Sequence, residues 1–185
     1  MPIPPSLTCY AYVDGQYIRS ELRDIGVDDE FDPRVPASTV RNERIGRSVP
    51  VLTRIFYYDA VDTQAPPEDQ ERQRAYLDKL QLLPDVHVVR GEVASGTRRR
   101  REQKGVDVQL AVDALRAAVA GNVQMIAIVS GDGDFAPLAR AIREAGPHVV
   151  VIAFSRSLSP RLRQEADRVI AFDQTVSDWS LRGAS

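Results

Sequence analysis

Aspartates beside glycines follow two of the apolar runs in this sequence. Asp14-Gly15 comes directly after the run Leu7 to Val13, and Ser130-Gly131-Asp132-Gly133-Asp134 comes directly after Met125 to Val129. Either pattern alone is also typical of a tight turn or a helix cap. In an open parallel sheet, however, the carboxyl ends of the strands meet at one edge, where ligands bind. The two patterns together therefore predict a group of carboxylates at that edge.

A third candidate carboxylate is Asp107, in the segment Lys104 to Asp107 that opens a predicted helix. On a helix that turns about 100° per residue, Asp107 projects away from the polar face that carries Gln109, Asp113 and Arg116. It lies instead among small apolar residues. A first-turn aspartate favoured by the helix dipole is the alternative. The apolar surroundings favour a carboxylate aimed at the sheet.

Convergence of these carboxylates would create a strong repulsion. Two carboxylates about 4 Å apart repel by roughly 4 kcal/mol at an effective dielectric of about 20, so the group must hold a proton or a cation. Oxygen ligands without His or Cys suit Mg²⁺ or Mn²⁺. Such an ion can activate water and stabilise charge during phosphodiester hydrolysis. The candidate catalytic and metal-binding residues are Asp14, Asp107, Asp132 and Asp134.

Short apolar runs alternate with amphipathic stretches along the chain, as in βαβ units. The runs predict five or six strands, at 7–13, 51–58, 86–89, 125–129, 149–154 and, more weakly, 169–172. Helices are predicted between them, at 16–25, 67–83, 106–120, 135–145 and 159–166. The predicted fold class is therefore α/β, with a central, mainly parallel sheet of five or six strands and helices on both faces.

Residues 1–175 are predicted to form a single domain, followed by a C-terminal tail at 176–185. The segment 26–50 fits neither a helical nor a strand period and contains three prolines, so we predict an inserted irregular loop there. Asp59 and Asp62 follow the second predicted strand. Asp59 is either an outer ligand of the site or a turn residue, and Asp62 is expected to be a turn residue.

The composition is that of an ordinary globular protein, with 185 residues, 43% of them hydrophobic and 27% charged. No stretch approaches the roughly 20 apolar residues that span a bilayer, and the first residues lack a signal-peptide pattern, so we expect a cytoplasmic protein without membrane contact. Cys9 is the only cysteine, which excludes an intrachain disulfide and a Cys-rich zinc site. A net charge of -2 argues against coating nucleic acid by bulk charge. Phosphate-binding P-loops and dinucleotide fingerprints are absent.

Several blocks of the sequence resemble the NYN family of PIN-like nucleases, within it the LabA-like bacterial branch. They occur in family order over about residues 7–172. The blocks are Val13-Asp14-Gly15, Tyr57-Tyr58-Asp59-Ala60, Lys104-Gly105-Val106-Asp107 with Asp113 farther along, and Ser130-Gly131-Asp132-Gly133-Asp134-Phe135-Ala136-Pro137-Leu138. The resemblance implies a Rossmann-like PIN fold, a divalent metal site and, in active members, RNA cleavage.

The resemblance also assigns roles to individual positions. The family's acidic positions fall on the four aspartates named above, and Ser130 falls on a small hydroxyl position beside them. The family usually has Asn three residues after the first Asp. Here that position is Tyr17, with Gln16 next to it as a substitute amide. A phenol at this place would either stack on a base or block the scissile phosphate.

Basic residues after the third predicted strand are candidates for RNA contacts. Arg98, Arg99, Arg100 and Arg101 are expected in a loop on the same edge as the carboxylates, where guanidinium groups would grip phosphates. Lys104 is a further candidate. For each, a solvated surface position is the alternative.

Three functions are compatible with these residues. The first is a metal-dependent ribonuclease. The second is a catalytically weak or inactive NYN module that binds RNA or a protein as a regulator, which Tyr17 favours. A metal-dependent phosphatase is the third, although the first strand lacks the Asp-x-Asp pair expected for one. A homodimer or a protein partner is compatible with each of them.

Overall fold

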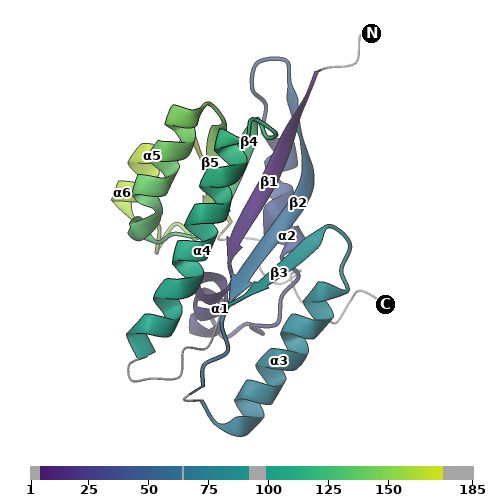
Figure 1. Ribbon diagram of the computed structural model, residues 1–185, viewed down its shortest axis with the longest axis vertical. Helices are drawn as coiled ribbons and strands as arrows, with labels where there is room; N and C mark the ends of the chain where they lie inside the picture. The colour runs from purple at the N-terminus through teal and green to yellow at the C-terminus, as the bar shows by residue number, and fades with distance from the viewer. Residues whose placement is uncertain (1–4, 64, 92–98, 173–185) are drawn as a thin grey trace.

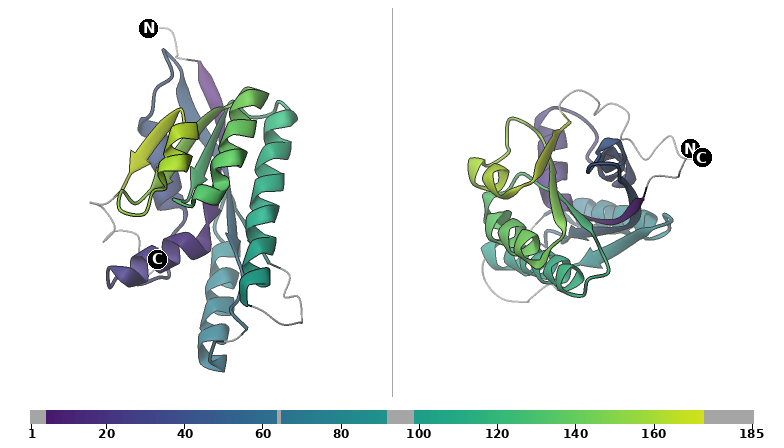
Figure 2. Two further views of the ribbon diagram at one scale, coloured as in Figure 1. Left: turned by 90° about the vertical axis from the view of Figure 1, so that its left-hand side faces the viewer. Right: turned by 90° about the horizontal axis from the view of Figure 1, so that it is seen from above.

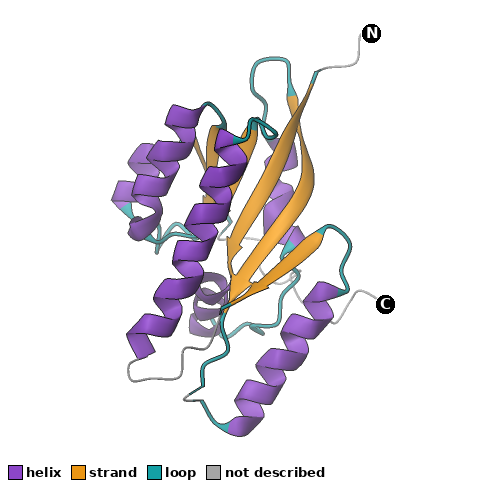
Figure 3. Ribbon diagram, in the orientation of Figure 1, coloured by secondary structure: helices purple, strands orange, loops and turns teal. Residues whose placement is uncertain are grey.

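The computed structural model describes residues 5–63, 65–91 and 99–172, without the side chains of 99–104. Within these ranges, six strands form one sheet in the order β3-β2-β1-β4-β5-β6, and every neighbouring pair is parallel (Figures 1 and 3). The strands are β1 (Ser6–Asp14), β2 (Val49–Asp59), β3 (Val86–Arg90), β4 (Met125–Val129), β5 (His148–Ala153) and β6 (Arg168–Ala171). The prediction of an α/β fold with a parallel sheet is confirmed.

Helices cover both faces of this sheet (Figure 2). One face is covered by α1 (Gly15–Asp24), α2 (Arg34–Ser38), the 3-10 helix η1 (Thr39–Asn42) and α3 (Pro67–Gln81). The other is covered by α4 (Arg99–Val119), α5 (Ala136–Ala145) and α6 (Pro160–Glu165). The short 3-10 helix η2 (Gly133–Phe135) leads from β4 into α5.

The core of the molecule lies on both sides of β1 and β4. Side chains of a strand point alternately to the two faces. Accordingly Ala11 and Val13 belong to the core under α1 and α3, whereas Tyr12 belongs to the core under α4 and α5. All five residues of β4 are buried. This pattern holds the carboxyl ends of β1 and β4 side by side in a rigid centre.

Helix α4 begins earlier than the sequence pattern predicted. The prediction was 106–120, whereas the helix runs over Arg99–Val119. Arg, Glu, Gln and Lys are good helix formers, and Gly105 costs only about 1 kcal/mol inside a helix, so the glycine does not stop it. Arg99 to Arg101 are therefore helical, and the expected loop position is wrong for them. Asp107 lies well inside the helix, which excludes the first-turn explanation for it.

The segment 26–50 is not wholly irregular, as it contains α2 and η1. Its residues Phe31, Ala37 and Val40 are fully buried in the core under α1 and α3. The Tyr76 hydroxyl of α3 donates a hydrogen bond to the Phe31 carbonyl at 2.8 Å. These apolar residues stand singly among charged ones in the sequence, so they form no helical or strand period that would predict their burial. The predicted tail at 176–185 lies outside the described residues.

Candidate active site at the carboxyl ends of β1 and β4

The strand order reverses between β1 and β4, because α1 leaves on one face of the sheet and α5 on the other. Val13 pairs with Val129, so the next residues of the two strands, Asp14 and Ser130, emerge beside each other. The Ser130 hydroxyl donates a hydrogen bond of 3.0 Å to Oδ2 of Asp14. Both residues are buried. A crevice at such a switch point is the usual ligand site of an open α/β sheet.

Asp132 is tied to the same pair through the backbone. Its amide donates a hydrogen bond of 3.1 Å to the Ser130 hydroxyl. Its own carboxylate accepts a hydrogen bond of 2.9 Å from the Asp134 amide and thereby caps η2. The helix cap that this pattern also indicated is therefore present, and Asp132 forms it. One serine hydroxyl therefore links the Asp14 carboxylate to the corner that carries Asp132.

A cavity of about 300 Å³ opens over these residues. It brings together side chains from β1, α1, α4 and the turn after β4. The cavity is lined by Asp14, Gln16, Tyr17, Ser20, Glu21, Asp107 and Asp132. Asp134 is exposed at the rim and does not line the cavity. Three of the four predicted carboxylates thus line one cavity, and the charge of the fourth, Asp134, is close enough to act on Asp107.

The carboxylates of the cavity influence each other's protonation. Burial raises the pKa of Asp14 to about 7, and the charges of Asp107 and Asp59 act in the same direction. Hydrogen bonds from the Tyr17 amide and the Ser130 hydroxyl oppose this rise. Burial, followed by the charges of Asp132 and Asp134, raises the pKa of Asp107 to about 6. Both carboxyl groups therefore titrate near neutral pH.

The donor set of the cavity suits a hard divalent ion in charge and atom type. Carboxylate oxygens and a hydroxyl are the ligands that Mg²⁺ and Mn²⁺ prefer. None of the described Lys or Arg side chains forms an ion pair with Asp14 or Asp107, so a cation would relieve their repulsion. In the described part of the chain, no three His, Cys, Asp or Glu side chains are arranged to hold a metal ion. Mg²⁺ is usually bound by one or two carboxylates together with several waters, so a pair of these carboxylates is enough to hold it.

Tyr17 holds the cavity wall rather than presenting a free hydroxyl. Its hydroxyl forms a hydrogen bond of 2.7 Å with the Ser157 hydroxyl and accepts one of 3.1 Å from the Phe154 amide. The ring packs so closely on Gly131 that a Cβ there would lie 2.6 Å from the Tyr17 hydroxyl oxygen. Burial raises the pKa of Tyr17 to about 12, so it stays protonated. Tyr17 thus joins α1 to the connection between β5 and α6.

Two residues of the cavity were missed in the sequence, Ser20 and Glu21. Glu21 is held by Arg156, whose Nε donates a hydrogen bond of 2.8 Å to its carboxylate. Helical spacing could have revealed both residues, because positions three and four after Tyr17 lie on the same side of α1. The basic residues predicted to contact RNA cannot be compared with the cavity. Arg98 lies outside the described residues, and the side chains of Arg99 to Arg101 and Lys104 are not described.

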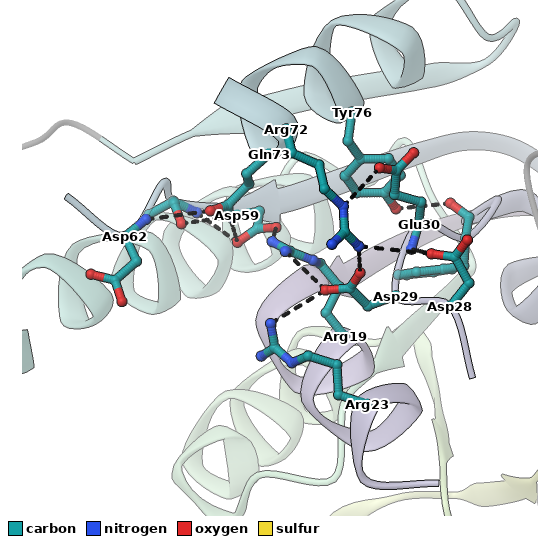
Figure 4. A network of polar contacts seen from close by, with 12 residues as sticks. Arg19, Arg23, Asp28, Asp29, Glu30, Asp59, Asp62, Arg72, Gln73 and Tyr76 are labelled. Atoms are coloured by element: carbon teal, nitrogen blue, oxygen red, sulfur yellow. Dashed lines mark hydrogen bonds and ion pairs between the residues drawn. The ribbon is translucent and has the colours of Figure 1, made fainter. Parts of the chain in front are cut away.

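A second, larger cavity of about 450 Å³ lies between α1 and α3 and is crossed by a polar network (Figure 4). The buried Asp29 carboxylate pairs with Arg19 at 3.1 Å, Arg23 at 3.3 Å and Arg72 at 2.5 Å. Arg19 also reaches the buried Asp59 at 3.0 Å. Asp59, whose role was left open, therefore belongs to this network and does not line the first cavity.

Known proteins resemble this chain in sequence and in fold. The chain is 42% identical over 65 residues to an uncharacterized protein of Methanocaldococcus jannaschii, a match that spans 35% of this chain and only 27% of that protein. The structure is similar to the crystal structure of a protein of unknown function from Vibrio parahaemolyticus, with a TM-score of 0.61, 22% identity and coverage of 94% of this chain and 98% of the other. This likeness shows a shared fold. A family model described as "NYN domain" matches residues 10–174.

Proposed function

Because the chain belongs to the NYN domain family, we propose that it is a metal-dependent ribonuclease that hydrolyses RNA phosphodiesters at the carboxyl ends of β1 and β4. We assign it to the LabA-like bacterial branch on its motifs at Asp14, Asp107 and Ser130 to Asp134. The membrane plays no part in this proposal, and no helix in the described ranges is long and apolar enough to cross one.

One observation carries the proposal: Ser130 links the buried Asp14 carboxylate to the Asp132 corner, with Asp107 in the same cavity. Elsewhere the protein pairs its buried carboxylates with arginines, as it does for Asp29 and Asp59. Instead burial raises the pKa of Asp14 and Asp107 to near neutrality. Perturbed carboxyl groups in a cleft are typical of functional sites.

Each residue then has a definite task in the proposal. Asp14, Asp107 and Asp132 would hold the ion, and Asp134 would add negative charge at the rim. A divalent ion held there supplies positive charge against the phosphate and lowers the pKa of the attacking water. Ser130 fixes the spacing of two carboxylate corners through its hydroxyl.

RNA would be held by groups around the cavity. Gln16 is exposed at its edge, and its amide can donate to a phosphate oxygen. Lys104 and the run Arg98 to Arg101 lie before Asp107 in the sequence, and we propose that they contact phosphates that flank the scissile bond. The ring of Tyr17 would act as a wall, since its hydroxyl is already engaged.

Cleavage of a labelled single-stranded RNA, with Mn²⁺, with Mg²⁺ and with EDTA, tests the proposal. We expect cleavage only with a divalent ion, and losses of roughly 100-fold or more for Asp14→Asn and Asp132→Asn. Asp24→Asn, an exposed aspartate on the same helix α1, is the matched control and should keep full activity. Cleavage that survives in Asp14→Asn would point to a contaminating nuclease. Mononucleotides tested in parallel separate a phosphatase from a nuclease.

A second candidate function is a catalytically weak or inactive module that binds RNA or a protein as a regulator. Tyr17 favours this function. It stands where the family has an amide, and its hydroxyl already forms hydrogen bonds with the Phe154 amide and the Ser157 hydroxyl. A filter-binding measurement distinguishes the two. If the wild-type chain binds RNA and Mn²⁺ yet cleaves no faster than Asp14→Asn, the binding module is the correct reading and the nuclease is wrong.

A further inference from the structure

Part of the sheet face on the side of α4 is not covered by any helix in the described ranges. Figure 1 shows β2 and β3 from this side, and no helix is drawn in front of them. The side chains on this part of the face include Tyr10, Phe56 and Val89, which are half-buried, and His87, which is exposed. Parallel sheets are almost always covered on both faces. The open part of this sheet is therefore a candidate surface for a ligand.

Aromatic rings form a row across three strands of this face. Tyr12 on β1, Phe56 on β2 and His87 on β3 are aligned by the strand register. The rings of Tyr12 and Phe56 stack at 5.0 Å and 14°, and those of Phe56 and His87 stack at 5.2 Å and 26°. Because β3 is the last strand on this side of the described sheet, no strand lies beyond His87. The row thus ends in an exposed ring on which another flat ring can stack.

A cation lies beside this row. The Arg54 guanidinium lies 5.5 Å from the centre of the Tyr10 ring, and the Tyr10 ring contacts the Phe56 ring edge to face at 6.0 Å. Arg54 is exposed and forms no ion pair with any described side chain. The open face therefore offers aromatic rings together with an unneutralised positive charge, which suits a ligand that is both flat and anionic.

A β-bulge turns Arg54 to this face. Cys9 of β1 pairs with Leu52 of β2. The next residue of β1, Tyr10, pairs with Arg54, so β2 contains one extra residue, Thr53, at this point. The Thr53 hydroxyl donates a hydrogen bond of 3.3 Å to the Cys9 carbonyl. Without the extra residue, the alternation of the strand would turn Arg54 to the opposite face. Bulges often redirect a side chain in this way near functional sites.

We propose that Tyr10, Arg54, Phe56 and His87 form a stacking platform for single-stranded RNA, with a base on His87 and the Arg54 guanidinium on a neighbouring phosphate. Aromatic rings beside a cation are how proteins hold unpaired nucleotides. In naming RNA, this inference rests on the proposed function. Asp14 follows Tyr12 by two residues, about 7 Å along β1, and His87 lies two strands to the side, about 10 Å away. One RNA strand can therefore contact the platform and the carboxylates.

Binding of a fluorescent single-stranded oligoadenylate, followed by anisotropy in EDTA, tests the platform without cleavage. His87→Ala should weaken binding about tenfold, the usual effect of losing one base–aromatic stack. His87→Phe should bind as the wild type does, because it keeps a flat ring. His148→Ala is the matched control, since His148 is also exposed but begins β5. Thermal unfolding confirms that all the variants fold.

The two changes at His87 decide whether the contact is a stack. Equal binding by His87→Ala and the wild type overturns the proposal. So does binding by His87→Phe that is as weak as that by His87→Ala, and so does a wild-type chain that binds no RNA.

The salt dependence of binding tests Arg54. Arg54→Gln should lower the slope of log K against log salt by about one, because one phosphate contact is lost. Arg161→Gln, an exposed arginine on α6, is the matched control and should keep the wild-type slope. An unchanged slope in Arg54→Gln overturns the phosphate contact.

Failure of the platform is distinguishable from failure of the proposed nuclease. In the cleavage assay, His87→Ala should raise KM far more than it lowers kcat, because His87 does not line the cavity at Asp14. If the wild-type chain cleaves no RNA, yet His87→Ala weakens binding and His87→Phe restores it, the nuclease is wrong and the platform stands. If cleavage needs Asp14 while His87→Ala binds RNA as the wild type does, the platform is wrong and the nuclease stands.

Discussion

Asp14 has two roles at the level of the single residue. It caps α1 by accepting a hydrogen bond of 3.0 Å from the Tyr17 amide, and it contributes a buried carboxylate to the cavity. Burial raises its pKa to about 7 from the ordinary 3.8. Between these pH values the folded protein holds a proton that the unfolded chain releases. The free energy of unfolding therefore falls as the pH rises through this window.

Asp14→Asn should remove this fall in the free energy of unfolding, because the amide does not titrate. Its oxygen still accepts the hydrogen bond from the Tyr17 amide. Without divalent ions, we expect the variant to exceed the wild type in free energy of unfolding by about 4 kcal/mol at pH 8, and to match it near pH 4. Urea unfolding at a series of pH values measures the difference. Asp24→Asn should follow the wild type throughout. A wild-type chain that gains stability over Asp14→Asn as the pH rises would show that Asp14 has a cationic partner.

Tyr17 is the residue whose contacts the sequence could not show. Its mismatch with the family amide predicts that the ring stacks on a base or blocks the phosphate, and the structure adds that its hydroxyl binds Phe154 and Ser157, far along the chain. No local pattern encodes that contact, because it depends on how β5 and α6 are placed in space. Asp14, Asp132 and Asp134 were predictable because glycine turns after apolar runs mark strand ends, whereas Asp107 was predicted from its apolar surroundings on a helix. Their exact spacing was not, since Ser130 sets it through two hydrogen bonds.

Tyr17→Phe should destabilise the fold. The Phe154 amide and the Ser157 hydroxyl lose a partner, and an unsatisfied buried donor costs about 1–3 kcal/mol. Tyr10→Phe is the control, because the Tyr10 hydroxyl forms no hydrogen bond with a described residue. Urea unfolding should give the larger loss for Tyr17→Phe. Equal losses in the two variants would mean that the Tyr17 contacts contribute little.

Among the elements, α1, α3 and the 27–30 connection are held together by one buried carboxylate. Asp29 accepts from Arg19, Arg23 and Arg72, which come from the two helices (Figure 4). Such a contact has no signature in a single sequence, because charged residues of both signs are common on amphipathic helices. The helices themselves were predictable from their apolar periodicity.

Asp29→Asn should loosen this junction. Breaking a buried ion pair leaves charges without a partner and costs roughly 3–5 kcal/mol. Asp78→Asn is the control, because its pair with Arg90 is exposed and worth about 1 kcal/mol or less. Thermal unfolding of both variants measures the contrast. A loss for Asp29→Asn no greater than that for Asp78→Asn would show that the network adds little stability.

For the whole molecule, burial is greatest at the centre of the sheet. Every residue of β4 is buried, whereas two of the four residues of the edge strand β6 are exposed. We expect amide hydrogen exchange to be slowest in Ile126 to Val129 and much faster in β6. Mass spectrometry of exchanged peptides measures this order. Protection in β6 equal to that in β4 would contradict it.

The strand order also has a consequence for how the protein is made. Strand β1 emerges first from the ribosome, yet it lies in the middle of the sheet between β2 and β4. At roughly 5–20 residues per second, several seconds of translation separate β2 from β4. During that time one edge of the nascent sheet is open to other chains, because its partner does not yet exist. Slowing synthesis before Met125 should therefore lower the yield of folded protein.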